Sequence, residues 1–194
     1  MDDWSRLFGG IRPTHRVLAK GETLFRAADP SQALHHLVRG RIRVTRPAAA
    51  GDSVTVHAVG AETLFAETAL FSPRYLCDAT ADLASEVRLY PKAAVLLHLS
   101  AHPDINLAFS AHLARQLERQ RGRVEVLRLK GAGERVVAHL AQLGAAEGVI
   151  TLDQPLTRLA GELGLTHEAL YRALARLQAE GRLARPGKRS FRLL

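Results

Sequence analysis

The sequence predicts an α+β protein with a β-rich N-terminal domain, one long helix, and a C-terminal helix-turn-helix followed by a β-hairpin. Short apolar runs separated by turn residues recur about every ten residues over 15–90. A proline-free stretch with apolar residues at heptad spacing follows over 104–130. Two short amphipathic helices then meet at a glycine within 153–181. We therefore expect three parts, at 1–103, 104–130 and 131–194.

The strands of the first part are predicted from apolar runs and the turns between them. Lys20-Gly21 and Arg39-Gly40 supply turn residues, and 47–53 suits a hairpin loop with Gly51-Asp52 as its turn. This pattern is typical of a β-sandwich or barrel. The expected strands are 17–19, 23–25, 36–38, 42–44, 54–57 and 87–90.

The long helix follows a short one expected at 92–98, and Pro103 can occupy its first turn. Its apolar stripe has the 4-3-4-3 spacing of a coiled-coil seam, with one polar position that can set the register. We predict that this stripe is the seam of a homodimer; the alternative is that the helix packs on its own β-domain. The seam residues are Leu113, Leu117, Gln120, Val124 and Leu127.

Glycines predict a break after the long helix, because Lys130-Gly131-Ala132-Gly133 suits a hinge. A helix at 134–143 and a short strand at 148–152 are expected next. The inward side chains of that helix should be Val136, Val137, Leu140 and Leu143.

Residues 153–181 contain the strongest motif of the chain. Asp153 or Gln154 can cap a first helix with Pro155 in its first turn, and Thr166 can cap a second helix after the turn at Gly164-Leu165. Gly181 ends the second helix. The inward residues are Leu156, Leu159, Ala160 and Leu163 in the first helix, and Ala169, Leu170, Ala173, Leu174 and Leu177 in the second.

The side chains left outside the second helix suit the major groove of DNA. Residues 168, 171 and 172 share one face, and N-terminal residues of such a helix reach base edges. Arg172 can donate two hydrogen bonds to guanine, and Glu168 can accept one from cytosine. The expected base-reading residues are His167, Glu168, Tyr171 and Arg172.

Other basic residues of this part are better placed for phosphates, which position a protein without reading sequence. Residues 182–193 are expected to form a terminal β-hairpin, or wing, around Pro186-Gly187-Lys188. The expected phosphate contacts are Arg158, Thr166, Arg176, Arg182, Arg185, Lys188 and Arg189.

The charge distribution agrees with a nucleic-acid partner. Residues 1–110 contain 12 Lys/Arg and 11 Asp/Glu, whereas residues 111–194 contain 15 Lys/Arg and 8 Asp/Glu. A basic C-terminal half indicates a polyanion, and charge alone fits double-stranded DNA or an anionic membrane. The motif described above favours DNA.

Composition excludes several other classes. Cys77 is the single cysteine, so neither an internal disulfide nor a site with four thiolates from one chain is available. The start Met1-Asp2-Asp3 lacks the pattern of a secretory signal. Apolar stretches such as 93–97 are far shorter than the roughly 20 residues that span a membrane. We expect a cytoplasmic protein without a membrane partner.

Four segments carry a resemblance to a known family: Lys20-Gly21-Glu22-Thr23-Leu24-Phe25, 38–44 with Gly40, 65–71, and 159–172. On these segments the chain resembles the Crp/Fnr (cyclic-AMP receptor protein / fumarate-nitrate regulator) family of transcription regulators, from about His15 to Leu194. The resemblance implies a double-stranded β-helix (β-roll) sensor of the cyclic-nucleotide-binding type, a dimer formed by the long helix, a palindromic DNA operator, and RNA polymerase as a partner. It also places Glu168 and Arg172 on base-reading positions, with His167 beside them.

The resemblance further implies an effector pocket at Phe65, Ala66, Glu67, Arg74, Cys77 and Asp78. In members that bind cyclic nucleotides, a glycine-glutamate pair begins the binding segment, its glutamate holds the ribose hydroxyl, and an arginine further on holds the cyclic phosphate. Glu67 matches the glutamate, but Ala66 replaces the glycine and Cys77-Asp78 replaces the arginine-serine pair. Glu62 also stands where a turn glycine is usual.

These departures leave the effector unknown. Arg74 is offset, and Asp78 would repel a phosphate, so the pattern disfavours a cyclic nucleotide. The alternative roles are a structural carboxylate for Glu67 and a small buried side chain for Cys77. A haem held by one histidine with Cys77, or by two histidines, stays open, whereas an iron–sulfur cluster would need more cysteines.

Two other functions fit parts of the sequence. A metal-dependent jelly-roll enzyme around His57, Glu62 and Glu67 would need clustered histidines, and His57 stands alone. The phosphate-binding loop ending in Lys-Ser/Thr and the Gly-x-Ser-x-Gly elbow are both absent from the sequence, so no enzyme is expected. His98 and His102 have metal-ligand spacing, but exposed or capping roles are favoured. The alternative function is a cyclic-nucleotide or haem sensing module that acts through a protein partner.

Overall fold

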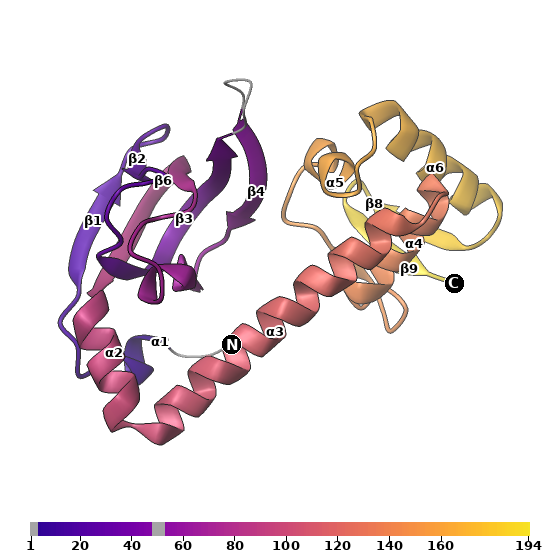
Figure 1. The fold of residues 1–194 in the computed structure, drawn as a ribbon. Helices are drawn as coiled ribbons and strands as arrows, with labels where there is room; N and C mark the ends of the chain where they lie inside the picture. The colour runs from indigo at the N-terminus through magenta and orange to yellow at the C-terminus, as the bar shows by residue number, and fades with distance from the viewer. Residues whose placement is uncertain (1–3, 48–52) are drawn as a thin grey trace. The chain divides into compact units, whose positions relative to one another are not determined.

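The computed structural model describes residues 4–47 and 53–194, whose backbone forms two compact units, Met1–Phe109 and Ser110–Leu194. The boundary lies inside the long helix, so that helix contributes residues to both units (Figure 1). In the described part of the chain, no helix is both long and apolar enough to cross a membrane.

The first unit is an antiparallel β-domain in which strands β1, β6, β3 and β4 lie side by side (Figure 1). Two short strands extend it, β2 on β6 and β5 on β3. The elements are α1 (Trp4–Leu7), β1 (Thr14–Leu18), β2 (Thr23–Phe25), β3 (Ala33–Pro47), β4 (Ser53–Val59), β5 (Thr63–Phe65), the 3-10 helix η1 (Glu67–Leu70) and β6 (Asp78–Pro91).

The sequence pattern divided β3 wrongly, because the strands expected at 36–38 and 42–44 are one strand. Its pairing with β6 shifts register around Gly40, which has a φ of 97°. A Cβ at this position would collide with Ser85 of β6. The glycine therefore bends the strand through an irregular register without ending it, as bulges do.

The first half of β6 was also missed. The buried Ala79 and Ala81 alternate with the half-buried Thr80 and Asp82, so the period of two that a strand requires is present. It is carried by alanine, which has little preference for strands. The turn predicted at Gly51-Asp52 lies outside the described residues, and the flanking strands β3 and β4 pair up to Pro47 and Ser53.

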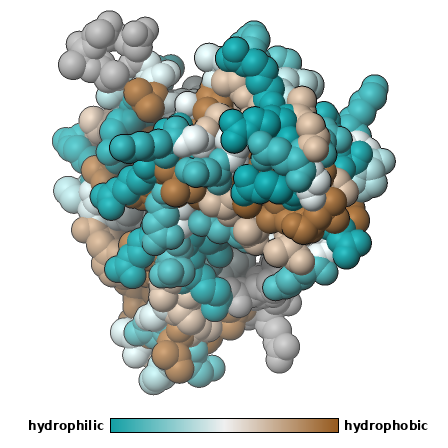
Figure 2. Space-filling view, turned by 90° about the vertical axis from the view of Figure 1, so that its right-hand side faces the viewer, coloured by the Kyte–Doolittle hydropathy of each residue, from teal (hydrophilic) through white to brown (hydrophobic). Residues whose placement is uncertain are grey.

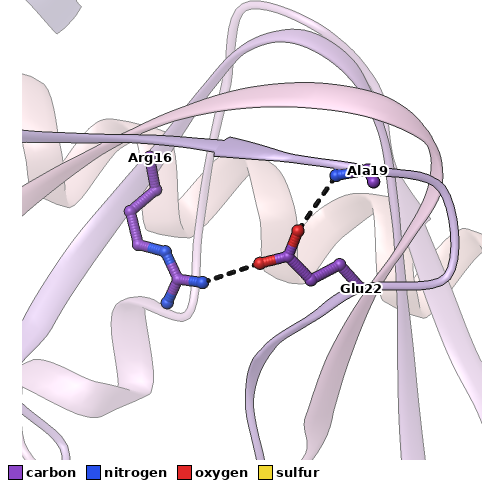
Figure 3. A network of polar contacts seen from close by, with 3 residues as sticks. All are labelled: Arg16, Ala19 and Glu22. Carbon is purple, nitrogen blue, oxygen red and sulfur yellow. Dashed lines mark hydrogen bonds and ion pairs between the residues drawn. The ribbon is translucent and has the colours of Figure 1, made fainter.

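The turn between β1 and β2 is closed by Glu22 (Figure 3). Its carboxylate accepts from the backbone N–H of Ala19 at 3.1 Å and from Nη2 of Arg16 at 3.0 Å. Gly21 has a φ of 88°, a conformation that favours glycine. The Lys20-Gly21-Glu22 segment is therefore a structural turn, which explains why glycine and glutamate occur at these positions.

A buried histidine lies among the aromatic side chains of this unit. The ring of His35 lies 5.0 Å from Phe25, 5.2 Å from Phe65 and 5.8 Å from Tyr75, measured between centroids. Burial, together with the charge of Arg16, lowers the pKa of His35 to about 3. The folded protein therefore keeps this imidazole neutral.

His35 should make the domain sensitive to acid. Between pH 6.5 and 3 the unfolded chain binds a proton that the folded state excludes, so the free energy of unfolding falls as the pH falls through this window. Between pH 7 and 5, we expect the free energy of unfolding to fall by about 2 kcal/mol less in His35→Phe than in the parent. Urea denaturation at both pH values measures this, with the exposed His15→Gln as control. Equal losses in parent and His35→Phe would contradict the prediction.

Two helices follow the β-domain: α2 (Lys92–Ala101) and α3 (Pro103–Arg128). Pro103 begins α3 as expected, because proline has no N–H and the first turn requires none. The helix ends at Arg128, two residues before the segment 130–133 that was expected to interrupt it.

The second unit packs the C-terminal end of α3, with Val126, three further helices and a three-stranded sheet around one apolar core. The sheet order is β7-β9-β8, and β8 and β9 form the predicted terminal hairpin. The elements are α4 (Ala132–Gln142), β7 (Ile150–Thr151), α5 (Leu156–Glu162), α6 (His167–Ala179), β8 (Leu183–Gly187) and β9 (Ser190–Leu193).

Most predicted inward residues of this unit are buried, with two corrections at helix ends. Leu143 follows the last turn of α4 and is 46% exposed, because the chain turns there before the apolar face is complete. Neither Asp153 nor Gln154 provides the first cap of α5. Pro155 occupies the cap position without a side-chain hydrogen bond, and Gln154 donates to Glu162 at 2.9 Å instead.

Candidate nucleic-acid interface

Helix α6 begins as the sequence predicts and exposes the predicted reading face. The hydroxyl of Thr166 caps it by accepting from the N–H of Ala169 at 3.1 Å. The opposite face packs into the core through Leu170, Ala173, Leu174 and Leu177. His167, Glu168, Tyr171 and Arg172 are all exposed.

The carboxylate of Glu168 is held in its ionised form. Hydrogen bonds from its own backbone N–H and from the Thr166 side chain lower its pKa, and the nearby charges of His167 and Arg172 act in the same direction. An ionised carboxylate accepts hydrogen bonds and donates none. Beside the donors of Arg172, it gives the first two turns of α6 both an acceptor and a donor.

Two of the proposed phosphate contacts are paired with carboxylates of their own helix. Arg158 lies 3.6 Å from Glu162 in α5, and Arg176 donates to Glu180 at 2.8 Å in α6. Arg182 also lies 3.6 Å from Glu180, whose pKa is lowered chiefly by the hydrogen bond from Arg176. These pairs are exposed or half-exposed, so DNA can compete for the arginines at little cost.

The wing presents the remaining basic residues. Lys188 is exposed in the turn between β8 and β9, and the neighbouring Arg189 donates to the carbonyl of Asp153 at 3.2 Å. This bond ties the turn of the wing to the segment before α5. Figure 2 shows one face of the molecule, on which hydrophilic residues predominate and hydrophobic ones lie between them, some gathered together.

Sequence reasoning missed Arg135, which organises the turn between α5 and α6. Its Nε donates to the carbonyl of Leu129 at 2.7 Å, just after α3. Its Nη1 donates to the carbonyl of Leu163 at 3.1 Å and lies 3.5 Å from that of Gly164. One side chain of α4 thus satisfies carbonyls at two helix ends. No pattern in the sequence signals this role, because folding alone brings the carbonyls of Leu163 and Gly164 next to Arg135.

Two of the six residues assigned to an effector pocket form hydrogen bonds with a nearby turn. Nη1 of Arg74 donates to the carbonyl of Ala28 at 2.6 Å, and the Asp78 carboxylate accepts from the N–H of Ala27 at 2.6 Å. Both groups therefore hold the turn after β2. An arginine held in this way is poorly placed to bind a cyclic phosphate.

The backbone at Ala66 and Glu62, where glycine is usual in the family, has the left-handed conformation that favours glycine. Ala66 precedes η1 with a φ of 59°, and Glu62 has a φ of 57° before β5. Both lie in the left-handed region, which costs about 1 kcal/mol or more for a residue with a Cβ. Phe65 is buried in the core and Glu67 is half-buried in η1. The turn therefore retains its shape without the glycines that usually permit it.

Cys77, His36 and His98 each lie close to a group of another kind. Nη2 of Arg46 lies 3.9 Å from Sγ of Cys77, which is half-buried. His36 is buried with its Nε2 3.5 Å from a Glu62 carboxylate oxygen, and Nε2 of His98 lies 3.0 Å from the Leu7 carbonyl. Among residues 4–47 and 53–194, no group of three or more potential ligands gathers.

The predicted seam of α3 is largely exposed in the single chain. Leu117 is 54% exposed, Val124 49% and Leu127 43%. Gln120 is also exposed, and Leu113 is half-buried. Apolar side chains that recur along one helix at this exposure are a surface that a partner can cover.

Residues 15–101 match the family model described as a cyclic nucleotide-binding domain. The chain is 26% identical over 178 residues to the CRP-like cAMP-activated global transcriptional regulator of Mycobacterium tuberculosis. This match covers 87% of the chain and 79% of that protein. It is 25% identical over 166 residues to the global nitrogen regulator of Synechocystis sp., with 84% and 72% covered. The names of these relatives are those of regulators, not of enzymes.

Solved structures share the fold over almost the whole chain. FixK2 from Bradyrhizobium japonicum matches with a TM-score of 0.70 at 23% identity, covering 94% of this chain and 93% of that one. The c-di-GMP responsive global regulator CLP from Xanthomonas campestris matches with a TM-score of 0.67 at 21% identity, covering 97% and 96%. At these identities the likeness establishes the fold.

Proposed function

Because the chain belongs to the Crp/Fnr family of transcription regulators, we propose that it is a homodimer that binds a palindromic DNA operator sequence-specifically. In this proposal α5, α6 and the β8–β9 hairpin form a winged helix-turn-helix. Residues 1–103 are the sensor, 104–130 the dimerisation helix and 131–194 the DNA-binding domain.

The observation that carries the proposal is the exposed N-terminal face of α6. Glu168 and Arg172 point away from the core on a helix whose other side is anchored by four buried residues. An arginine can donate two hydrogen bonds to guanine, and an ionised glutamate can accept from cytosine. The basic balance of residues 111–194 supports contacts with the DNA backbone.

The apolar stripe on α3 supports the dimer. Two copies joined through Leu117, Val124 and Leu127 would remove these side chains from water. Two recognition helices in successive major grooves would then lie roughly 34 Å apart. The sensor domain would respond to an effector and RNA polymerase would be the partner at the promoter, by likeness to the family. The contacts of Arg74 and Asp78 disfavour a cyclic nucleotide as that effector.

The alternative function is a sensing module that acts through a protein partner. The match of residues 15–101 to the cyclic nucleotide-binding family favours a sensor. A function through a protein partner, however, gives the exposed face of α6 no role. Binding of the intact protein to duplex DNA across salt concentrations separates the two functions. A DNA-binding regulator loses affinity steeply as salt rises, because bound phosphates release counterions.

Arg172→Ala tests the reading face directly. A duplex selected by the parent protein from a random-sequence pool provides the probe. We expect the binding free energy of the variant to weaken by about 1–3 kcal/mol per half-site. Its discrimination between bases should also fall at one base pair of each half-site. Binding to an unselected duplex should change little.

Arg12→Ala is the matched control, because Arg12 is exposed and belongs to the β-domain unit. It should keep the affinity and the preference of the parent. If Arg172→Ala retains the full sequence preference, α6 does not read bases through this side chain.

A further inference from the structure

Arg185 of the wing lies between two aromatic rings. Its Cζ is 5.8 Å from the centroid of Tyr171 in α6 and 5.6 Å from that of Phe191 in β9. Phe191 is fully buried in the core of the second unit, whereas Tyr171 is 41% exposed on the reading helix. The guanidinium therefore bridges the core of the wing and the face expected to meet DNA, at distances typical of cation–π contacts.

The same guanidinium also closes the turn of the wing. Nη2 donates to the carbonyl of Lys188 at 2.7 Å, within the hairpin that joins β8 to β9. Nε is buried, with no hydrogen-bond acceptor among the described residues. An arginine holds a phosphate through two adjacent N–H groups of its planar fork. With Nε inaccessible, the edge formed by Nε and Nη2 is closed to a phosphate, and Nη2 already donates one of its two N–H groups to the Lys188 carbonyl.

The contacts continue from Tyr171 to the first turn of α6. The rings of Tyr171 and His167 lie 4.5 Å apart between centroids, with an angle of 50° between their planes. Phe191, Arg185, Tyr171 and His167 thus form a continuous row from the buried sheet to the beginning of the helix. The row links the position of Lys188 at the wing turn to the orientation of two base-reading candidates.

We propose that Arg185 is a positioning residue for DNA recognition rather than the phosphate ligand that its charge suggests. It holds Tyr171 and the wing turn in a fixed relation, so that α6 and Lys188 meet one duplex together. This inference rests on the proposed DNA-binding function. It changes the role expected for Arg185 while leaving Lys188 as a phosphate contact.

The salt dependence of binding to the selected duplex distinguishes a positioning residue from a phosphate ligand. We expect Arg185→Lys to bind about tenfold more weakly than the parent, because an ammonium cannot span both rings and the carbonyl. Its charge is unchanged, so the slope of log affinity against log salt should equal that of the parent. Lys188→Ala, the comparison variant, should lower the slope by about one for each protomer.

Arg185→Met, made alone and in the Lys188→Ala background, provides the second measurement. In that background the Lys188 contact is already absent, so a positioning role predicts weaker binding with the slope of Lys188→Ala, whereas a phosphate ligand predicts a slope lowered by about one more per protomer. The inference is overturned if Arg185→Met lowers the slope further in the Lys188→Ala background, or if Arg185→Lys binds as tightly as the parent.

A measurement on the free protein separates this inference from the proposed function. In the intact, DNA-free protein, both Arg185 variants should shift the NMR resonances of the Tyr171 ring and speed hydrogen exchange at the amides of the wing turn. Unchanged resonances and exchange overturn the positioning role. If the parent itself fails to bind any duplex, the proposed function fails, and that result is independent of the behaviour of the Arg185 variants.

Discussion

Replacing Leu117 with aspartate is expected to abolish both dimerisation and tight operator binding. Leu117 is more than half exposed in the single chain and lies at the middle of the apolar stripe on α3. In a dimer its replacement would place two carboxylates in a dry seam, and burying an unpaired charge costs several kcal/mol. Because Leu117 is outside the core of the single chain, the monomer should still fold.

The loss of DNA affinity should be at least a thousandfold. Specific binding of a regulator to its site is typically about 10³ to 10⁷ times tighter than the non-specific binding of the same protein. Sedimentation or gel filtration measures the assembly, and binding to the selected duplex measures affinity. Arg119→Ala is the control, because it changes the net charge by the same single unit at an exposed position off the seam. A Leu117→Asp protein that remains dimeric and binds tightly would show that the seam lies elsewhere.

Arg135→Met is expected to destabilise the second unit by about 2–4 kcal/mol. The substitution keeps most of the aliphatic volume and removes the donors that satisfy the Leu129 and Leu163 carbonyls. Hydrogen bonds from charged donors contribute about 1.5–3 kcal/mol each, and their loss leaves carbonyls at two helix ends without those donors. The turn that sets α6 against α5 should loosen, so operator binding should weaken together with stability.

Denaturation followed by helical circular dichroism measures the effect on stability. Arg128→Met is the matched control, because Arg128 is an exposed arginine in the last turn of α3. It should leave the midpoint within about 0.5 kcal/mol of the parent. An Arg135→Met protein as stable as the Arg128→Met protein would show that water replaces the guanidinium without cost.

The helical half of the fold followed closely from the sequence because its signals are local. A capping threonine, a turn glycine and apolar spacing of three and four residues act within one or two turns, and α6 begins and packs as these signals predict. The β-domain was less predictable. Gly40 continues β3 through an irregular register where a turn was expected, and this depends on Ser85, which is distant in sequence.

The same contrast applies to charged side chains. Sequence position alone grouped Arg158, Arg185 and Lys188 as phosphate contacts. The structure separates them, because Arg158 is paired with Glu162, Arg185 is enclosed by Tyr171 and Phe191, and Lys188 is exposed at the turn. A charge in a sequence shows what a side chain can bind, whereas its neighbours in space decide which of its donors are available.

By itself the sequence determined the order of the parts, the faces of the C-terminal helices and the candidate reading residues. These depend on periodicity and capping, which act between residues a few positions apart. Only the tertiary structure decided that Arg74 and Asp78 hold a turn, that Arg135 joins two helix ends and that Arg185 bridges two rings. Each of these roles needs a partner from another element, and chain folding, not sequence spacing, brings such partners within hydrogen-bonding or stacking distance.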